Sequence, residues 1–369
     1  MSDAIVPIVM PKWGMSMKEG RLTGWHVEEG EAITAGQEIM DVETDKIAIA
    51  VKAADAGLLR RKLGEEGVVY PVKSMLGVLA PVEVTDAEID VYIETFEAPG
   101  LGDSDGQDEE PAYEFVETLS GRLRFATRPG EGRSVVFVHG FGGDLDNWLF
   151  NIDAAAAGRP AYAFDLPGHG QSVKQISEPS LEAMTDALEQ FIDAMGLEEA
   201  DLVGHSLGGL ISCDLALRGG DVVRSLTLIS PAGFGPEINS DYIDGYVSAA
   251  SRRDLKPVLQ MLFADPGLVS RSMIDDVLKY RRLDGVQTAL EALAVAMFAG
   301  GGQSVLIVDR LAGLQLPVQV IWGGKDQVIP VSQARALPDA SVVIVKDAGH
   351  MAQMEAASEV NQLISALAD

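Results

Sequence analysis

A serine set between two glycines is the residue of this sequence best placed for nucleophilic chemistry. The segment 204–208 reads Gly-His-Ser-Leu-Gly, with Ser206 at its centre, and it follows a short apolar run. Glycines on both sides let a chain turn sharply from a strand into a helix, which leaves the central hydroxyl exposed at the strand end. Helical spacing of apolar residues follows the segment. The pattern therefore predicts an activated serine.

Two segments near the C-terminus could supply the base and the acid of a serine centre. Asp326 follows a predicted strand at 318–322, and His350 follows another at 341–345. The order Ser206, Asp326, His350 is that of α/β-hydrolases. His350 would remove the proton from an attacking hydroxyl or thiol, and Asp326 would fix its tautomer. Asp347 is an alternative candidate for the acid, but it lies on the same loop as His350. Ser230 occupies a position where some α/β-hydrolases carry the acid, and a serine there leaves Asp326 as the main candidate.

A glycine-rich turn after the predicted strand 134–138 could bind an oxyanion. Residues 139–143 read His-Gly-Phe-Gly-Gly, so the backbone N–H of Phe141 could act together with that of Leu207, the residue after the serine. Residues 165–172, Asp-Leu-Pro-Gly-His-Gly-Gln-Ser, resemble a loop common in the α/β-hydrolase superfamily. We expect His139, His169 and His205 to orient these loops through hydrogen bonds. We expect Cys213 to be a buried small side chain.

Lys46 is the second residue whose position suggests chemistry. It lies between two β-type runs and follows Asp45, which favours a tight turn, so it would project from the tip of a hairpin. By itself such a lysine is equally well a solvated surface charge. The order of motifs over 10–20, 25–31 and 43–46, however, closely resembles the lipoyl domains of dihydrolipoamide acyltransferases.

That resemblance extends from residue 5 to residue 84 and implies both a fold and a cofactor. Lipoyl domains are flattened barrels of two four-stranded sheets, and lipoate is attached covalently to the lysine at the exposed hairpin, here Lys46. Biotin carrier domains share the fold but place their lysine between methionines. Asp45 and Ile47 flank Lys46, so lipoate is favoured.

The chain is long enough for two domains. We expect a small all-β lipoyl domain at 4–84, an acidic flexible linker at 85–112, and an α/β-hydrolase domain with a helical lid at 113–369. The linker holds ten Asp or Glu and no Lys or Arg, so it should repel itself and extend. Its stretch 89–96 alternates and could instead form an extra strand. The helix-rich insertion at about 235–311 is the expected lid.

A lipoyl domain joined to an α/β-hydrolase domain resembles the dihydrolipoamide acetyltransferase subunits of acetoin dehydrogenase complexes over nearly the full length. The resemblance implies acetyl transfer from S-acetyl-dihydrolipoyl-Lys46 to coenzyme A. It implies a thiamine-diphosphate-dependent enzyme and an FAD-dependent dihydrolipoamide dehydrogenase as partners. The sequence departs from ordinary dehydrogenase acyltransferases, because it has neither a basic peripheral-subunit-binding segment nor a His-x-x-x-Asp-Gly signature. The chemistry would then fall to Ser206, His350 and Asp326, through an acetyl-serine or by direct thiol attack.

Two other functions stay open at this level. The second domain could hydrolyse a thioester or ester beside the lipoyl carrier, or it could be a catalytically silent assembly module.

A net charge of -28 argues against binding to nucleic acid or anionic membrane. No apolar run reaches the roughly 20 residues of a membrane span, and no spacing indicates a metal site. One cysteine and no secretory leader favour a cytoplasmic location. The acyl group and homo-oligomer formation are left open.

Overall fold

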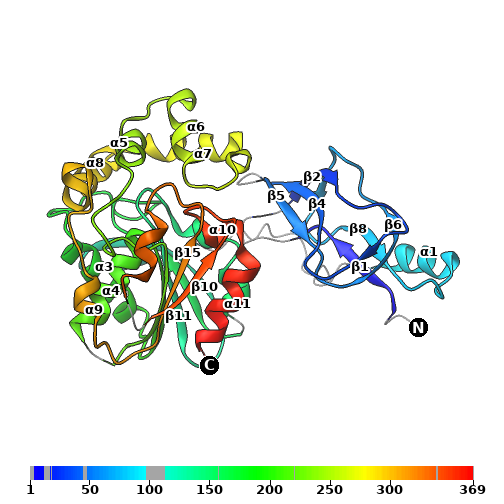
Figure 1. Ribbon diagram of the computed structural model, residues 1–369, viewed down its shortest axis with the longest axis horizontal. Coiled ribbons are helices and arrows are strands. Elements are labelled where there is room, and N and C mark those ends of the chain that lie inside the picture. Colours follow the sequence, from blue (N-terminus) through cyan, green and yellow to red (C-terminus); the bar gives the residue numbers. More distant parts are fainter. Residues whose placement is uncertain are drawn as a thin grey trace. The chain divides into compact units, whose positions relative to one another are not determined.

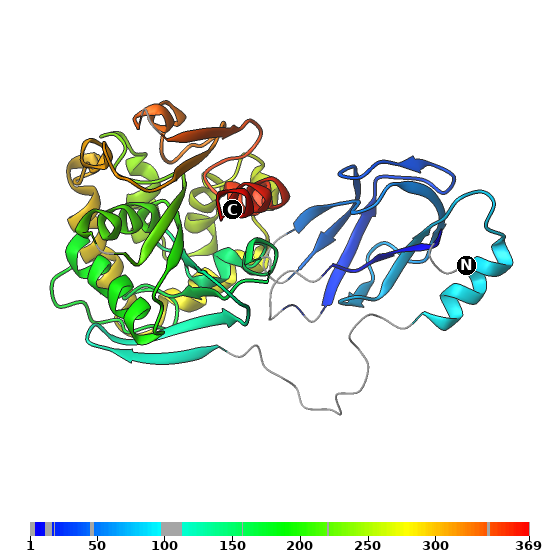
Figure 2. The ribbon, with the colours of Figure 1, turned by 90° about the horizontal axis from the view of Figure 1, so that it is seen from below.

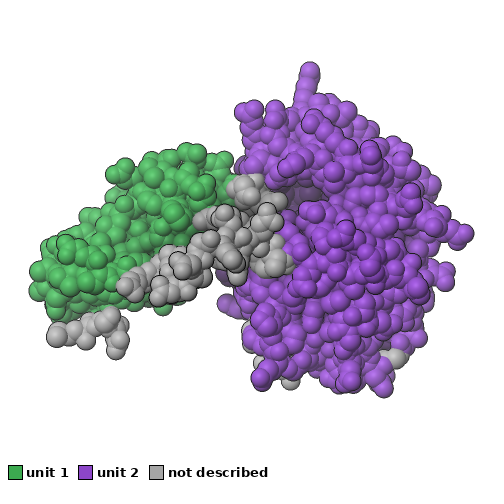
Figure 3. Space-filling model, turned by 180° about the vertical axis from the view of Figure 1, so that it is seen from behind, with its two compact units in different colours: residues 1–111 green, residues 112–369 purple. Residues whose placement is uncertain are grey.

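The computed structural model divides the chain into two compact units, residues 1–111 and 112–369 (Figure 3). It describes residues 4–11, 17, 19–44, 48–96, 113–156, 158–219, 221–337 and 340–368. Among these residues, no helix is long and apolar enough to cross a membrane.

The first unit consists of two four-stranded antiparallel sheets, as expected for a lipoyl domain. One sheet has the order β1 (Val6–Val9), β8 (Met75–Leu79), β6 (Gly57–Lys62) and β3 (Ala32–Ile33). The other has the order β5 (Ala48–Lys52), β4 (Glu38–Glu43), β2 (Glu19–Trp25) and β7 (Val69–Pro71). In β2 the residues alternate, with Gly20 and Leu22 buried and their neighbours exposed. This period of two is that of a strand with one face toward a core.

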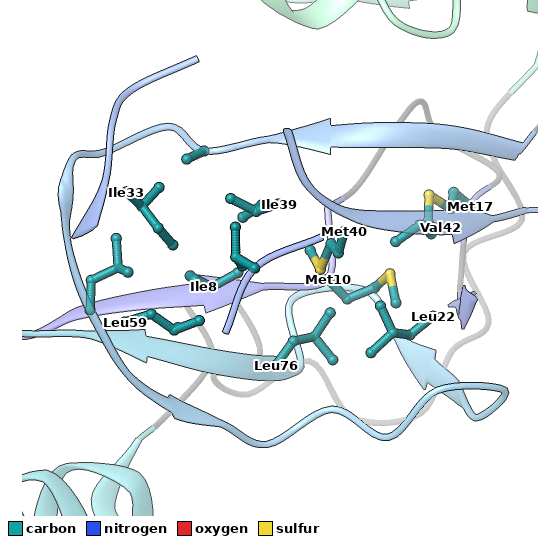
Figure 4. Close-up of a cluster of buried hydrophobic side chains, with 13 residues drawn as sticks. Ile8, Met10, Met17, Leu22, Ile33, Ile39, Met40, Val42, Leu59 and Leu76 are labelled. Carbon is teal, nitrogen blue, oxygen red and sulfur yellow. The ribbon is translucent and has the colours of Figure 1, made fainter. Parts of the chain in front are cut away.

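Both sheets contribute side chains to one hydrophobic core (Figure 4). Ile8, Leu59 and Leu76 come from the first sheet, whereas Leu22 and Met40 come from the second. Burying one such side chain contributes roughly 1.5–3 kcal/mol. The core therefore holds the two sheets face to face and makes the unit a rigid support for the hairpin of β4 and β5.

Residues 85–96 differ from the sequence-based expectation. They form neither an extended linker nor a strand, because α1 spans Asp86–Thr95. Thr85 caps this helix in a reciprocal capping box with Glu88, and Ile89 is fully buried in a cluster with Val78 and Ala80. The helix is thus packed on the first unit. The expected flexible linker keeps only residues 97–112, which lie outside the described part of the chain.

The second unit is built on an eight-stranded, mostly parallel sheet. Its order is β16 (Ser341–Val345), β15 (Val318–Gly323), β14 (Val223–Ile229), β13 (Ala200–His205), β11 (Ser134–Val138), β12 (Ala161–Phe164), β10 (Gly121–Arg128) and β9 (Glu114–Thr118). The six strands from β16 to β12 run parallel, and β10 pairs antiparallel with both β12 and β9. Strands β11 and β13 are buried at every residue, as required when helices cover both faces of a sheet.

Helices cover both faces of this sheet and form a lid. One face carries α3 (Leu181–Ala194), α4 (Leu207–Arg218) and α9 (Val308–Leu311), and the other carries α10 (Ala352–Glu355) and α11 (Ala357–Ala368) (Figures 1 and 2). Helix α2 (Ile152–Ala156) contacts α11. Outside the lid, short 3₁₀ segments lie at Leu145–Trp148 and Val331–Arg335.

The lid lies between β14 and β15, where an insertion was expected. It contains α5 (Ser240–Ser248), α6 (Arg252–Gln260), α7 (Arg271–Arg281) and α8 (Val286–Phe298), with 3₁₀ turns at Pro266–Leu268 and Ala299–Gly301. In Figure 1 these helices are grouped together above the sheet. The predicted helical lid is therefore confirmed.

Candidate active site

Ser206 occupies a strained turn between β13 and α4. Its backbone angles are φ 53° and ψ -118°, a region that residues other than glycine rarely adopt. A Cβ added at Gly208 would lie 2.1 Å from the carbonyl oxygen of Val138, and one at Gly204 would lie 2.6 Å from the oxygen of Gly208. Both flanking positions thus require glycine. The turn presents the serine at the carboxyl edge of the sheet, as the motif predicts.

His350 and Asp326 form a buried pair at the same edge of the sheet. The Nδ1–H of His350 donates to Oδ2 of Asp326 at 2.8 Å, and the two side chains are 2% and 0% exposed. The other carboxylate oxygen accepts from the backbone N–H of Val328 and Ile329 at 2.8 and 2.9 Å. The carboxylate is therefore fixed at both oxygens, and Nε2 of His350 stays available to accept a proton.

The residue before the serine holds the histidine loop against the nucleophile turn. The Nε2–H of His205 donates to the backbone oxygen of His350 at 3.0 Å, and the two rings lie 4.7 Å apart. Within the described residues no hydrogen bond joins Ser206 to His350. Catalytic hydrogen bonds are often long in unliganded enzymes and tighten when substrate binds. The structure brings the base and acid into contact and places their loop beside the serine turn.

The predicted oxyanion loop also lies against the serine. A Cβ added at Gly140 would lie 3.0 Å from Cβ of Ser206, so a side chain there would crowd the nucleophile. Phe141 follows in the loop, and Leu207 is the first residue of α4. The first N–H groups of a helix have no partner within the helix. In the described part of the chain, neither the Phe141 N–H nor the Leu207 N–H is used in another hydrogen bond, so both are available to an oxyanion.

Gly142, next in the loop, is held from two sides. Its N–H donates to Nε2 of His169 at 3.1 Å. Its carbonyl accepts from the hydroxyl of Tyr246, a buried residue of lid helix α5, at 2.7 Å. The Tyr246 ring also contacts the Phe141 ring edge to face, with centroids 5.9 Å apart. The lid thereby positions the oxyanion loop, a role that no sequence motif indicated.

The three histidines of the second unit other than His350 orient loops, as predicted. His139 accepts at Nε2 from the N–H of Leu166 at 3.0 Å and donates from Nδ1 to a backbone oxygen. His169 similarly donates from Nδ1 to Pro167 O at 3.0 Å. Burial lowers the pKa of His139 to about 4 and that of His169 to about 3. Both are therefore neutral at pH 7, as their accepting Nε2 atoms require.

A buried ion pair supports the loop at 165–172. Asp165 accepts from Nε and an Nη of Arg124 at 2.6 and 3.1 Å, and both side chains are almost fully buried. Its carboxylate also accepts from the N–H of Leu145 and of Gln171 at 2.9 and 2.7 Å. Four hydrogen bonds satisfy the buried charge. Sequence reasoning found the Asp165 loop but gave no signal for Arg124, its partner from β10.

The competing groups are not positioned for catalysis. Asp347 is 75% exposed and pairs with Lys325 at 2.9 Å, so it does not contact His350. Ser230 is fully buried and its hydroxyl has no hydrogen-bond partner among the described residues. Cys213 is buried in α4, and burial raises the pKa of its thiol, which keeps it protonated. Asp326 is thus the acid that faces His350.

Lys46 belongs to the connection between β4 and β5, and residues 45–47 lie outside those that the structure describes. The two strands pair antiparallel, with Glu43 opposite Ala48. A connection of this length between paired strands fits the lysine-bearing hairpin of a lipoyl domain. Within the described residues, no cluster of three or more His, Cys, Asp or Glu could hold a metal ion.

Comparison with known proteins assigns both units. Residues 133–357 match the family described as alpha/beta hydrolase fold, and residues 6–79 match the biotin and lipoyl attachment family described as biotin-requiring enzyme. The dihydrolipoyllysine-residue acetyltransferase component of the acetoin cleaving system of Cupriavidus necator is 52% identical over 99% of this chain and 97% of its own. The chain belongs to this family of acetyltransferase components. The component with the same name from Pseudomonas putida is 44% identical over 96% of each chain.

Solved structures similar to this acetyltransferase component match its second unit and show its fold alone. A meta-cleavage product hydrolase has a TM-score of 0.63 at 21% identity, covering 69% of this chain and 97% of its own. The carboxylesterase CesB from Bacillus subtilis has a TM-score of 0.61 at 22% identity, covering 69% and 90%. The predicted α/β-hydrolase fold and the predicted family are both confirmed.

Proposed function

We propose that this chain transfers an acetyl group from S-acetyl-dihydrolipoyl-Lys46 to coenzyme A as the acetyltransferase component of an acetoin-cleaving system. The observation that carries the proposal is near full-length similarity to components of that name, which spans the lipoyl unit and the serine centre together. When attached, lipoate supplies a dithiol arm that carries the acetyl group as a thioester. All the other chemistry is assigned to side chains and amides of the second unit.

Ser206 begins the proposed reaction. Its Oγ attacks the carbonyl carbon of the acetyl thioester while its proton passes to Nε2 of His350. The N–H groups of Phe141 and Leu207 stabilise the oxyanion, and Asp326 stabilises the imidazolium. The carbon–sulfur bond then breaks, His350 returns its proton to the departing thiolate, and Ser206 keeps the acetyl group as an ester.

The second half repeats these steps with the thiol of coenzyme A. His350 takes the thiol proton, the thiolate attacks the acetyl-Ser206 carbonyl, and the same two amides hold the oxyanion. The carbon–oxygen bond breaks, His350 protonates Ser206, and acetyl-coenzyme A leaves. One oxyanion site thus serves both steps. In the direct alternative, His350 activates the coenzyme A thiol for attack on the thioester without acetyl-Ser206.

Single-turnover mass spectrometry tests the covalent route. The full chain is mixed with S-acetyl-dihydrolipoamide without coenzyme A, digested and analysed for acetyl groups. We expect one acetyl group on Ser206 that disappears when coenzyme A is added. A Ser206→Ala variant should lose transfer. If that variant transferred acetyl at the full rate, the covalent route would be wrong and direct thiol attack would replace it.

Hydrolysis is the alternative function, since the second unit shares its fold with ester hydrolases. The centre is largely buried, with Ser206 6% exposed and His350 2% exposed. A thiol delivered to a site that excludes water can react with the acyl group before water does. Thioester or ester hydrolysis would instead require ready access of water to acetyl-Ser206.

The proposal also names partners. A thiamine-diphosphate-dependent enzyme would load the acetyl group onto the lipoyl arm, and an FAD-dependent dihydrolipoamide dehydrogenase would reoxidise the arm. We further propose a cytoplasmic location. Copurification of the three components on one affinity-tagged subunit would test the assembly.

A further inference from the structure

The lid contains a segment whose charge is opposite to that of the rest of the chain. Residues 251–282 hold seven Lys or Arg against four Asp or Glu, a net charge of +3, within a chain of net charge -28. A quarter of the 28 Lys and Arg of the protein lie in these 32 residues. Such a reversal attracts a negatively charged ligand that the remaining surface would repel.

Six of the seven cations of this segment are exposed on or at the end of two adjacent lid helices, α6 and α7; Figure 1 shows the two helices. We call this the cationic lid face, and it consists of Arg252, Arg253, Lys256, Arg271, Lys279 and Arg282. On α6, residue 256 lies four positions from 252 and three from 253, which places it beside both on the helix surface. On α7, residues 271, 275 and 279 follow one another at intervals of four, and Arg282 is the cap residue that follows the helix. All six are exposed.

One carboxylate ties the two helices together within this face. Asp275 accepts from an Nη of Arg252 at 2.6 Å, and it lies four residues from both Arg271 and Lys279. The pKa of Asp275 is lowered by its hydrogen bond to Arg252 and by the positive charges of Arg252, Arg271 and Arg282. The four carboxylates of the segment are fewer than its seven cations, so the segment keeps a surplus of positive charge.

Five of the six cations have no ion-pair partner among the described residues. Only Arg252 is paired, with Asp275, and its side chain is still 55% exposed. Elsewhere in the second unit, Arg218 and Arg224 form ion pairs with Asp or Glu. Unpaired guanidinium and ammonium groups on a folded helix pair are donors suited to phosphate oxygens.

The cationic lid face is linked to the catalytic loop by the residues that follow α6. The backbone oxygen of Leu262 accepts from the N–H of Met351, next to His350, at 3.1 Å. The carboxylate of Glu355 accepts from the N–H of Ala264 at 2.7 Å and from that of Gly349 at 2.5 Å. A ligand held on α6 and α7 would therefore rest on helices that connect directly to a segment hydrogen-bonded to the loop of His350.

The other open feature of the lid has the wrong charge for phosphate. A groove of about 640 Å³ between α5 and α8 is lined by Asp244 and Glu291 together with apolar residues such as Val295. Carboxylates repel a polyanion at this position.

We propose that the cationic lid face binds the phosphates of coenzyme A, so that the adenosine end rests on α6 and α7 and the thiol end reaches Ser206. This inference rests on the proposed function, since it concerns the acceptor of the same reaction. The diphosphate and the 3′-phosphate of coenzyme A are its only charged groups. On the cationic lid face these phosphates would contact cations, whereas the rest of the chain carries an excess of carboxylates.

The test compares acceptors with and without phosphates. The full chain without lipoate is assayed with free S-acetyl-dihydrolipoamide as donor and with coenzyme A or phosphate-free pantetheine as acceptor. The double variant Arg271→Glu/Lys279→Glu reverses two exposed cations. The matched control is Arg335→Glu, an exposed arginine outside the lid. We expect the double variant to raise KM for coenzyme A at least tenfold and to leave KM for pantetheine within twofold, whereas the control changes neither.

Salt gives a second readout in the wild-type chain. Exposed charge interactions weaken as ionic strength rises, so KM for coenzyme A should increase with salt while KM for pantetheine stays constant. If the double variant handled coenzyme A normally, or impaired both acceptors equally, the cationic lid face would not bind the phosphates.

Calorimetric titration with coenzyme A needs no turnover and separates this inference from the proposed function. Binding by the wild-type chain that is lost in the double variant supports the phosphate site. Equal binding by both, or none by either, overturns it. Binding without any acetyl transfer would support the phosphate site and overturn the proposed transferase function.

Discussion

Replacing Asp326 by asparagine should nearly abolish activity while leaving the site intact. In the native pair, one carboxylate oxygen accepts from the N–H groups of Val328 and Ile329, and the other accepts from Nδ1–H of His350. An asparagine must place its oxygen on the two amides, because the reverse orientation would lose two hydrogen bonds worth about 0.5–1.5 kcal/mol each. Its NH₂ group would then face Nδ1 of His350.

This orientation reverses the tautomer of the base. Nδ1 must now accept, so the proton moves to Nε2, which can no longer take the proton of Ser206. In a serine protease the same exchange lowers kcat about 10⁴-fold, equivalent to about 5.4 kcal/mol of lost transition-state stabilisation. We expect a loss of similar size here. KM should change little, since the side chain of Asp326 is 0% exposed and faces His350.

The assay is the initial rate of acetyl transfer from S-acetyl-dihydrolipoamide to coenzyme A, with thermal melting to verify folding. Asp347→Asn is the matched control, because Asp347 is an exposed acid on the histidine loop that pairs with Lys325. The control should retain near-native kcat. An Asp326→Asn protein that kept more than a tenth of the wild-type kcat, or a control as inactive as Asp326→Asn, would refute the assigned roles.

Three further predictions follow from the same geometry. Tyr246→Phe removes the hydrogen bond to the Gly142 carbonyl, so kcat should fall about 5- to 30-fold, for a buried bond worth roughly 1–2 kcal/mol, with KM unchanged; an equal rise in KM would contradict a positioning role. Burial holds the pKa of His139 at about 4 and of His169 at about 3, below the value of about 6.5 in an unfolded chain. The folded state then binds fewer protons, so the melting temperature of the second unit should fall as the pH drops from about 6.5 to 4; His169→Asn should flatten that curve, and an unaltered curve would contradict this cause. Lys46→Arg should abolish lipoylation, seen by intact mass, but preserve transfer from free S-acetyl-dihydrolipoamide; loss of both would contradict separate roles for the two units.

Most of the fold and most of the candidate site could be predicted from local sequence patterns. Strands β11 and β15 were predictable because buried parallel strands are near-continuous apolar runs. Ser206 was predictable because its turn requires glycine at 204 and 208, and those glycines stand beside it in the sequence. Asp326 and His350 were predictable because each lies in the loop after a strand and follows Ser206 in the chain order of α/β-hydrolases.

The helix at residues 86–95 was not predicted because the acidic composition was given more weight than a local helix-capping pattern. Their many acids suggested an extended linker, yet Thr85 and Glu88 carry the spacing of a capping box. That box, together with burial of Ile89 against the first unit, stabilises a helix.

Tyr246 and Arg124 could not be found from sequence for a different reason. Tyr246 contacts Gly142 across 104 residues, and Arg124 contacts Asp165 across 41. Neither residue belongs to a motif. Only the packing of the lid and of the sheet edge brings these pairs together, so their roles depend on tertiary structure alone.

The measurement that most directly tests transfer through Ser206 is the fate of the acetyl group. The full chain is supplied with S-acetyl-dihydrolipoamide, with and without coenzyme A, and acetyl-coenzyme A and free acetate are both quantified. We predict that acetyl-coenzyme A is the main product when coenzyme A is present and that little acetate forms in its absence. Acetate released at the same rate in both samples would show a hydrolase and contradict the proposed function.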